Sequence, residues 1–494
     1  MNHQPNTTRT RRVFFAAGAV ATGVVAVAVA AWLAASPGAN WSWRDLRGWY
    51  NPAVGFHSAA LPVGFEDLVD RIKPAVVGVR AKVEQDDEDE EERARPGRGI
   101  SPSGRVSPQR RITTSQGSGF FISPDGLAMT TYHVVARNKK IEVVTDNGRT
   151  YAAKLVGADP KTDLALLKVD GGDEFPVVRM SDRAPRIGEW VLAIGNPFGL
   201  GGTVTAGIVS AGARGILSPY SDFIQIDAPI NQGNSGGPTF DATGRVIGVN
   251  SAIFSPSGGS VGVGFAIPAE TVKAIADRLK TKGAVSRGWI GVEVQSMSPE
   301  IAEGLGLDKP AEGVLVAEIQ PDSPATKAGI EPGDIITSLA GRPASDERDL
   351  IRRVGDMPPG TTVELRLLRR NQDKLITVAL GELPVERTED RPDAENPEPA
   401  HGGDKSKMGL MLMPADKLGL DAQGVVIAGV NPSGVGAESG LSVGDVILEV
   451  GGNSVKTPED FFTALASVQT QGKRIALARI KSNEATRFVA IPVN

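Results

Sequence analysis

Short apolar runs, separated by turns that contain Gly and Pro, dominate the chain between residues 64 and 285. Runs of this length with polar borders are typical of β-strands, and no long helical pattern lies between them. Many short strands without intervening helices predict an all-β pair of barrels or a sandwich. The pattern predicts strands at 75–83, 119–122, 127–131, 164–169, 191–194, 204–211, 223–226, 246–249 and 263–267.

Two helices are expected at the borders of this β region. The first is a short amphipathic helix at 65–72. The second spans 268–281, where Thr271, Ile275 and Leu279 recur at the helical period and share one face. Both helices are therefore expected to pack against the strands through one side only.

The C-terminal part of the chain repeats itself. The stretch 313–336, which begins Gly-Val-Leu-Val, recurs without a gap as 424–447, which begins Gly-Val-Val-Ile. Two copies are too few for a solenoid, so the repeat indicates two small domains.

Two polar stretches interrupt these patterns. The first, at 84–111, contains the acidic run 86–92 followed by Arg, Pro, Gly and Ser, and such a run is normally a solvated loop. The second, at 385–406, combines Pro with charged residues that exclude a packed core, so it is expected to link the two copies.

The N-terminus indicates export. Three arginines at positions 9, 11 and 12 precede an uncharged segment at 13–35, and positive charge before an apolar segment keeps that end in the cytoplasm. The segment fits a cleaved signal peptide or a retained inner-membrane anchor, and its length favours the anchor. The stretch 10–15 is similar to a twin-arginine signal. Aromatic residues that suit a membrane interface or an oligomer contact follow at Trp41, Trp43, Trp49 and Tyr50.

Composition removes several classes of function. A chain of 494 residues is too long for one core and indicates about three domains. The net charge of −5 gives no basic footprint for nucleic acid, and the lack of cysteine excludes disulfides and Cys-ligated metals. Only four histidines are present, at positions 3, 57, 133 and 401, and this scarcity makes a histidine-dependent mechanism easy to assign.

The octapeptide 231–238 carries the strongest candidate chemistry. Ser235 lies between glycines that permit a tight turn, and the amides of Gly233, Ser235 and also Asn234 could hold an oxyanion. The Gly-x-Ser-x-Gly spacing also matches the α/β-hydrolase elbow, but that fold places its histidine after the serine, where only the linker residue His401 remains. A plain turn between strands is the simpler alternative.

The order of the candidate residues along the chain favours a catalytic arrangement other than that of the α/β-hydrolases. His133 ends a predicted strand, and Asp163 opens the strand at 164–169. The order histidine, aspartate, serine is that of the chymotrypsin-like proteases with two β-barrels. The candidate catalytic residues are His133, Asp163 and Ser235.

Four segments resemble the HtrA (Do/DegP-like) serine proteases: 130–135 (TTYHVV), 162–169 (TDLALLKV), 195–199 (GNPFG) and 233–238 (GNSGGP). The resemblance covers roughly residues 64–494, and Tyr132 stands where that family often has Asn or Ala. It implies an ATP-independent serine endopeptidase of envelope protein quality control in the periplasm, with no cofactor and no metal. It also implies homotrimers or larger assemblies of trimers.

The same resemblance implies a substrate cleft and two peptide-binding modules. Each repeat copy is similar to a PDZ domain, which binds a peptide as an added strand and holds its C-terminal carboxylate on backbone amides. The cleft contains no acidic residue, so a small aliphatic residue is expected at the cleaved position. The implied cleft residues are Asn250, Ser251, Ala252, Ile253, Gly262, Val263 and Gly264. The implied carboxylate loop of the first copy is Arg287, Gly288, Trp289, Ile290, Gly291 and Val292.

In the second copy, the residues at the place of the carboxylate loop are Lys407-Met408-Gly409-Leu410, which match the loop less well. The second copy therefore either binds peptide or only packs against a neighbour. The alternative function is a chaperone or peptide-binding scaffold with a latent protease domain. The expected organisation is a basic N-region at 1–12, the apolar segment at 13–35, a linker at 36–63, a chymotrypsin-like protease domain at 64–282, PDZ domains at 284–384 and 407–494, and the linker at 385–406.

Overall fold

The computed structural model describes residues 64–84, 112–136, 140–171, 174–197, 201–215, 218–256, 258–307, 312–384, 408–415, 424–482 and 485–493. The expectations for the N-terminal segments 1–63, the acidic loop and the linker at 385–406 lie outside these residues. Within the described part, none of the helices is both long enough and apolar enough to span a bilayer.

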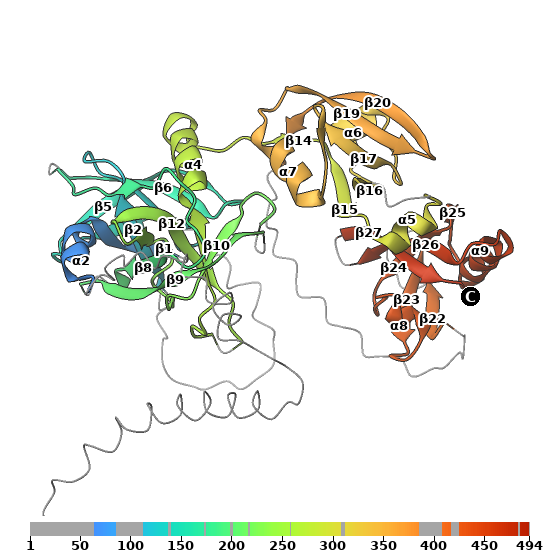
Figure 1. Ribbon diagram of the computed structural model, residues 1–494, viewed down its shortest axis with the longest axis horizontal. Coiled ribbons are helices and arrows are strands. Elements are labelled where there is room, and N and C mark those ends of the chain that lie inside the picture. Colours follow the sequence, from blue (N-terminus) through green and yellow to red (C-terminus); the bar gives the residue numbers. More distant parts are fainter. Residues whose placement is uncertain are drawn as a thin grey trace, which may run out of the picture. The chain divides into compact units, whose positions relative to one another are not determined.

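Six antiparallel strands form a closed barrel in the order β1-β2-β3-β6-β5-β4 (Figure 1). Strands β3 and β6 are almost completely buried, and Phe121, Ala128 and Leu167 are fully buried in the core. The strands are β1 (Val76–Glu84), β2 (Ile112–Phe121), β3 (Leu127–Thr131), β4 (Lys140–Val144), β5 (Thr150–Asp159) and β6 (Leu164–Val169).

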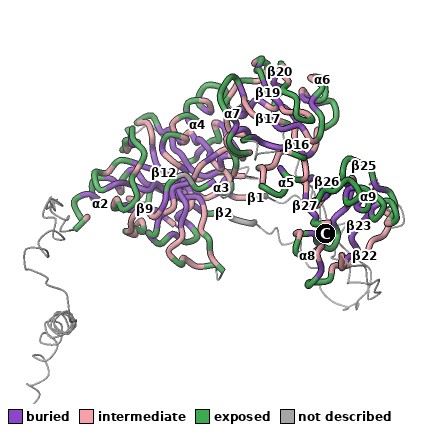
Figure 2. Tube along the Cα trace, turned by 45° about the vertical axis from the view of Figure 1, so that its right-hand side comes forward, coloured by how far each residue is buried: buried purple, intermediate pink, exposed green. Residues whose placement is uncertain are grey.

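A second barrel follows in the order β11-β8-β9-β10-β13-β12, closed by pairing of β11 with β12. The short strand β7 (Arg179–Met180) lies parallel to β12 at its side. Buried residues run along the strands of both barrels (Figure 2). The strands are β8 (Trp190–Gly195), β9 (Thr203–Arg214), β10 (Phe223–Ile226), β11 (Pro238–Asp241), β12 (Arg245–Ile253) and β13 (Gly264–Pro268).

Helices at the two ends of this region seal the core. Helix α2 (Glu66–Ile72) leads through the 3-10 turn η2 (Lys73–Ala75) into β1, and helix α4 (Ala269–Lys282) contacts β5 and β6 of the first barrel and β12 and β13 of the second. Val272, Ile275 and Leu279 lie on the buried face of α4. Val272 therefore takes the buried position that was expected for Thr271. A one-turn helix, α3 (Tyr132–Val135), follows β3 directly.

Each repeat copy folds as a six-stranded sheet with short helices. In the first copy the sheet order is β15-β16-β17-β19-β20, and β18 pairs with β17. Its elements are β14 (Gly288–Trp289), β15 (Val292–Ser296), α5 (Pro299–Gly304), β16 (Val314–Ile319), α6 (Pro324–Ala328), β17 (Ile335–Leu339), β18 (Arg342–Pro343), α7 (Glu347–Asp356), β19 (Thr362–Arg369), β20 (Gln372–Ala379) and β21 (Gly381–Glu382).

The second copy repeats this order as β22-β23-β24-β26-β27, with β25 beside β24. Its elements are β22 (Leu410–Pro414), β23 (Val425–Val430), α8 (Val435–Glu438), β24 (Val446–Val450), β25 (Asn453–Ser454), α9 (Pro458–Thr470), β26 (Ile475–Ser482) and β27 (Ala485–Pro492). The fold class expected from the sequence is thus confirmed: two barrels followed by two related β domains.

Candidate active site

The octapeptide 231–238 lies at the end of the loop between β10 and β11, and its last residue, Pro238, begins β11. Gly233 and Gly236 have φ values of 96° and 85°, a region that favours glycine. A Cβ on Gly233 would lie 2.5 Å from the Cβ of Pro197, so the loop has no room for a side chain there. The glycines of the motif therefore fix the path of the backbone on both sides of Ser235.

Asp163 holds His133 at two points. One carboxylate oxygen lies 2.8 Å from His133 Nδ1, and the other accepts a hydrogen bond of 3.0 Å from the His133 amide. Asp163 has a φ of 57°, which is unusual for a residue with a side chain and is stabilised here by these bonds. Because Nδ1 faces the carboxylate, Nε2 is the ring nitrogen left to accept a proton.

Ser251 forms hydrogen bonds with both Asp163 and Ser235. Its hydroxyl donates to Asp163 over 2.8 Å, and its carbonyl accepts a 3.3 Å hydrogen bond from the Ser235 hydroxyl. No hydrogen bond between Ser235 and His133 is present among the described residues. In enzymes without substrate such bonds are often long and tighten on binding, so rotation about χ1 of Ser235 is the step that would complete the triad.

Two backbone amides of the loop are available for an anion. Within the described part of the chain, the amides of Gly233 and Ser235 have no hydrogen-bond partner, whereas the Asn234 amide donates to Asn231 over 3.0 Å. An oxyanion hole built from two amides thus fits this backbone, with Asn234 already engaged.

Ser118, on β2, is a supporting residue that the sequence did not reveal. Its amide donates to the Ser235 carbonyl over 2.8 Å, and its hydroxyl donates to the Gly233 carbonyl over 2.5 Å while accepting from the Asn196 amide. Ser118 is fully buried and therefore positions the loop without reaching a substrate. In the sequence, its position between Gly117 and Gly119 is the one local feature that indicates a tightly packed site. A Cβ at Gly117 would lie 2.9 Å from the Ser235 carbonyl oxygen, so a side chain has no room there.

The expected cleft residues divide into two groups. Asn250 is fully buried: its backbone amide and carbonyl bond to Gly237 and Gly236, and its side-chain oxygen accepts a hydrogen bond from Thr239, so Asn250 supports the loop from within the core. Ala252 and Ile253 are half-buried on β12 and lead into the turn 254–263, whose Ser260 amide donates to Asn231. Gly262 and Val263 belong to the same turn, and Gly264 begins β13.

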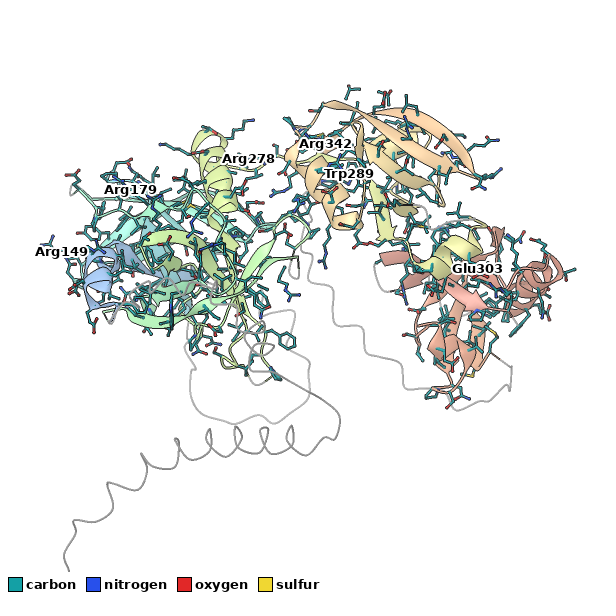
Figure 3. The ribbon with its side chains drawn as sticks, viewed as in Figure 1. Arg149, Arg179, Arg278, Trp289, Glu303 and Arg342 are labelled. Carbon is teal, nitrogen blue, oxygen red and sulfur yellow. The ribbon has the colours of Figure 1, made fainter. Side chains whose placement is uncertain are left out.

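The expected carboxylate loop lies between β14 and β15 in the first repeat copy. Trp289, labelled in Figure 3, is on β14, which contacts α7. The amides of Ile290 and Gly291 have no hydrogen-bond partner among the described residues, and Gly291 has a φ of 85°. A cavity of about 460 Å³ lies beside them, lined by Gly288, Val292 and apolar side chains of α7 and, from the barrel region, by Pro160, Lys161, Ser218, Pro219 and Tyr220.

The structure corrects one residue of that loop. Arg287 is buried, and its guanidinium forms a bidentate pair with Asp159 at 2.8 and 2.7 Å, so it does not face the cavity. A buried guanidinium requires an anionic partner, and that partner lies 128 positions earlier in the sequence. Within the described residues, no group of three or more His, Cys, Asp or Glu side chains is placed to hold a metal.

Comparison with protein families identifies three domains. Residues 117–249 match the trypsin-like peptidase domain, and residues 288–380 and 426–479 each match a PDZ domain.

Relatives named as endoproteases are similar to this chain along most of its length. A probable periplasmic serine endoprotease DegP-like of Brucella suis biovar 1 (strain 1330) is 41% identical over 470 residues, which cover 87% of this chain and 90% of the relative. The corresponding protein of Rhizobium meliloti (strain 1021) is 41% identical over 483 residues, covering 89% and 94%.

The chain is also similar to solved structures. The HtrA-type protease AlgW with decapeptide is 40% identical with a TM-score of 0.57, and the similarity covers 66% of this chain and all of AlgW. The serine endoprotease from Yersinia pestis is 35% identical with a TM-score of 0.51 over the same shares.

Proposed function

Because this chain belongs to the DegP-like serine endoproteases of the HtrA type, we propose that Ser235, His133 and Asp163 are its catalytic triad. The observation that carries the assignment is the pair of hydrogen bonds that the Asp163 carboxylate accepts from His133, next to a serine on a glycine-fixed loop. The protein is a serine endopeptidase, and the alternative of a scaffold with a latent protease is not favoured.

In the proposed mechanism, Ser235 Oγ attacks the carbonyl of the scissile peptide while His133 Nε2 takes its proton. Asp163 holds the imidazole and stabilises its cation, and Ser251 positions that carboxylate through its hydroxyl. The Gly233 and Ser235 amides bind the oxyanion that forms on the attacked carbonyl. His133 then returns the proton to the leaving amine, and water releases the acyl group from Ser235 by the same route.

The substrates are proposed to be unfolded or misfolded proteins, whose extended segments can enter the cleft. Ala252, Ile253 and Val263 are half-buried and are proposed to line this cleft, and their small and apolar side chains support cleavage after small aliphatic residues. The PDZ domains are proposed to bind peptide C-termini, and the apolar cavity beside Ile290 and Gly291 supports this role for the first domain. AlgW, whose structure contains a decapeptide, supports peptide binding by analogy.

Location and assembly are also proposed. The relatives are named periplasmic, which supports a periplasmic location reached through the segment 13–35, as a signal peptide or an anchor. The side chains of Ile187 and Trp190 are exposed and close together in the sequence, and the Trp190 ring contacts the half-buried ring of Phe65 with centroids 6.0 Å apart. Exposed apolar groups of this kind support a contact between copies, as a trimer or a larger assembly.

Hydrolysis of unfolded casein tests the proposed function. Purified protein should fragment casein without ATP, whereas the Ser235→Ala variant should leave it intact. Circular dichroism of the variant controls for its fold. If both proteins leave casein intact, the proposed protease activity on unfolded chains is wrong.

A further inference from the structure

The two PDZ domains of the chain are in contact with each other. The contact joins α5, β15 and β16 of the first domain to β26 and β27 of the second. Its apolar part is one cluster, in which Leu315 and Ile335 of the first domain and Leu477 of the second are buried and Phe488 packs against them. A Cβ on Gly304 of α5 would lie 2.5 Å from Leu477 Cγ, so the two surfaces fit closely.

Hydrogen bonds from the second domain hold strand β15. The Gln295 side chain accepts a 2.6 Å bond from the Phe488 amide and donates to the Phe488 carbonyl over 3.2 Å. Glu293 accepts a 2.8 Å bond from the Thr486 amide, and Glu318 of β16 accepts from the Thr486 hydroxyl. Glu293 and Glu318 are directly opposite each other across the two strands, where like charges repel. Thr486 therefore stabilises both carboxylates by donating to each.

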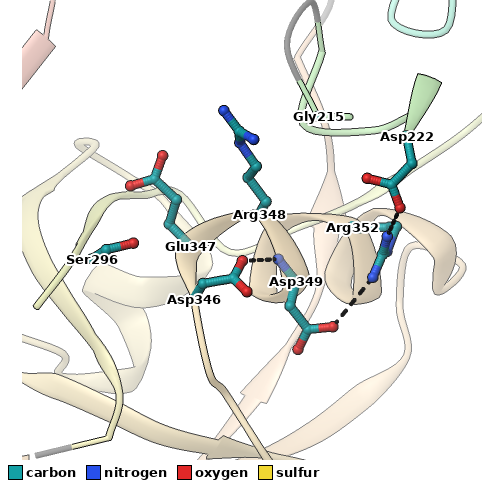
Figure 4. Close-up of a pocket in the computed structure, with 8 residues that line it drawn as sticks. All are labelled: Gly215, Asp222, Ser296, Asp346, Glu347, Arg348, Asp349 and Arg352. Atoms are coloured by element: carbon teal, nitrogen blue, oxygen red, sulfur yellow. Dashed lines mark hydrogen bonds and ion pairs between the residues drawn. The ribbon is translucent and has the colours of Figure 1, made fainter. Parts of the chain in front are cut away.

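The other residues of β15 line cavities on the opposite side of the strand. Val292 and Val294 line the cavity beside the carboxylate loop, and Ser296 lines a separate polar cavity bordered by the first turn of α7 (Figure 4). Successive side chains of a strand point to opposite faces, so Glu293 and Gln295 face the second domain while the other three face these cavities. The strand that is expected to receive a peptide is thus held from behind by the second domain.

Strand β15 benefits from this support because it lies at the edge of its sheet. Among the described residues it pairs with β16 alone, and its register shifts between Glu293 and Val294. A peptide that adds to such a strand must also hold the strand in its extended conformation. Binding to a strand that is already ordered costs less conformational entropy. Docking of the second domain and binding of a peptide therefore favour the same state of β15.

We propose that docking of the second PDZ domain onto β15 raises the affinity of the first PDZ domain of the same chain for peptide C-termini. The inference rests on the proposed binding of peptide ends by the first domain. It gives the second domain a role that does not require it to bind peptide itself. By thermodynamic linkage, a bound peptide strengthens the docking by the same factor.

Peptide affinity of the full chain tests the proposal. The protein carries Ser235→Ala, so that the probe, a fluorescent decapeptide ending in valine, is not cut. Phe488→Lys places a charge in the apolar contact and leaves the first domain unchanged. It should weaken peptide binding roughly fivefold or more and speed hydrogen exchange of the β15 amides. Ala466→Lys adds the same charge at an exposed position of α9 and should change neither. Unchanged affinity in Phe488→Lys would overturn the inference.

An engineered disulfide tests whether the contact lies within one chain. The protein contains no cysteine, and Gly304→Cys/Leu477→Cys places two thiols within bonding reach across the contact. The oxidised protein should run as a monomer on a non-reducing gel. Added to Phe488→Lys, the disulfide should restore the peptide affinity, and reduction should remove it again. A disulfide between copies, or a locked protein that binds as weakly as the reduced one, would overturn the inference.

One further variant separates this inference from the proposed function. Ile351 lines the cavity of the first domain, and Ile351→Glu should abolish peptide binding by placing a charge in that apolar site. If the parent protein binds no peptide, or if Ile351→Glu binds it unchanged, peptide capture by the first domain is wrong and the inference falls with it. Binding that Ile351→Glu abolishes and Phe488→Lys leaves intact would overturn the inference alone.

Discussion

Removal of the Arg287 guanidinium is expected to destabilise the turn that presents Asp163. The side chains of Arg287 and Asp159 are 6% and 2% exposed, so Arg287→Met would leave a carboxylate buried without its cation. Breaking a buried pair in this way costs about 3–5 kcal/mol. Asp159 also accepts hydrogen bonds from Thr162 and Lys161, so it holds the turn immediately before Asp163. The variant should lose local stability and peptidase activity together.

Hydrogen exchange of the amides of Asp159, Lys161, Thr162 and Asp163 measures this effect locally, since a multidomain chain does not unfold in one step. A loss of about 3 kcal/mol corresponds to roughly a hundredfold faster exchange. The double variant Arg287→Met/Asp159→Asn removes the stranded charge and should recover part of the loss. Arg186→Met, at an Arg side chain that is 84% exposed, is the control and should cost less than about 1 kcal/mol. Unchanged exchange in Arg287→Met, or a double variant as unstable as the single one, would refute the reasoning.

Three further outcomes follow from the geometry. Ser118→Ala should lower kcat about tenfold or more with little change in KM, because the Gly233 carbonyl loses a buried hydrogen bond worth about 1–3 kcal/mol; steady-state kinetics on a peptide substrate checks this. Gly233→Ala should abolish turnover while circular dichroism stays unchanged, since its Cβ would meet Pro197; full activity would contradict the assigned oxyanion loop. Trp190→Lys should shift the protein to a smaller species in light scattering, and an unchanged mass would exclude this residue from a contact between copies.

The sequence predicts best the strands in which apolar and small residues predominate. Strands β3 and β6 begin and end at the expected residues, because every position between their bordering turns except Lys168 is apolar or small. Strand β5 was not predicted, since its exposed and buried positions do not alternate regularly and Lys154 lies in its middle. The missing alternation reflects a bulge between Leu155 and Gly157, which shifts the register.

In the candidate site, too, some residues could be predicted from the sequence and others could not. His133, Asp163 and Ser235 were predicted because histidine is scarce and the chain order is informative. The roles of Ser118 and Arg287 were not, because each acts on a partner more than 100 positions away. Side chains that act by contact across the fold leave no periodic or spacing signal in the chain.

Covalent labelling tests the central assignment most directly. A fluorophosphonate reacts with a serine only when a neighbouring base activates it and amides hold the resulting oxyanion. Mass spectrometry of the labelled protein should find one adduct on the peptide that contains Ser235, and His133→Ala should abolish it. An adduct on a different serine, or full labelling of the Ser235→Ala variant, would contradict the proposed triad.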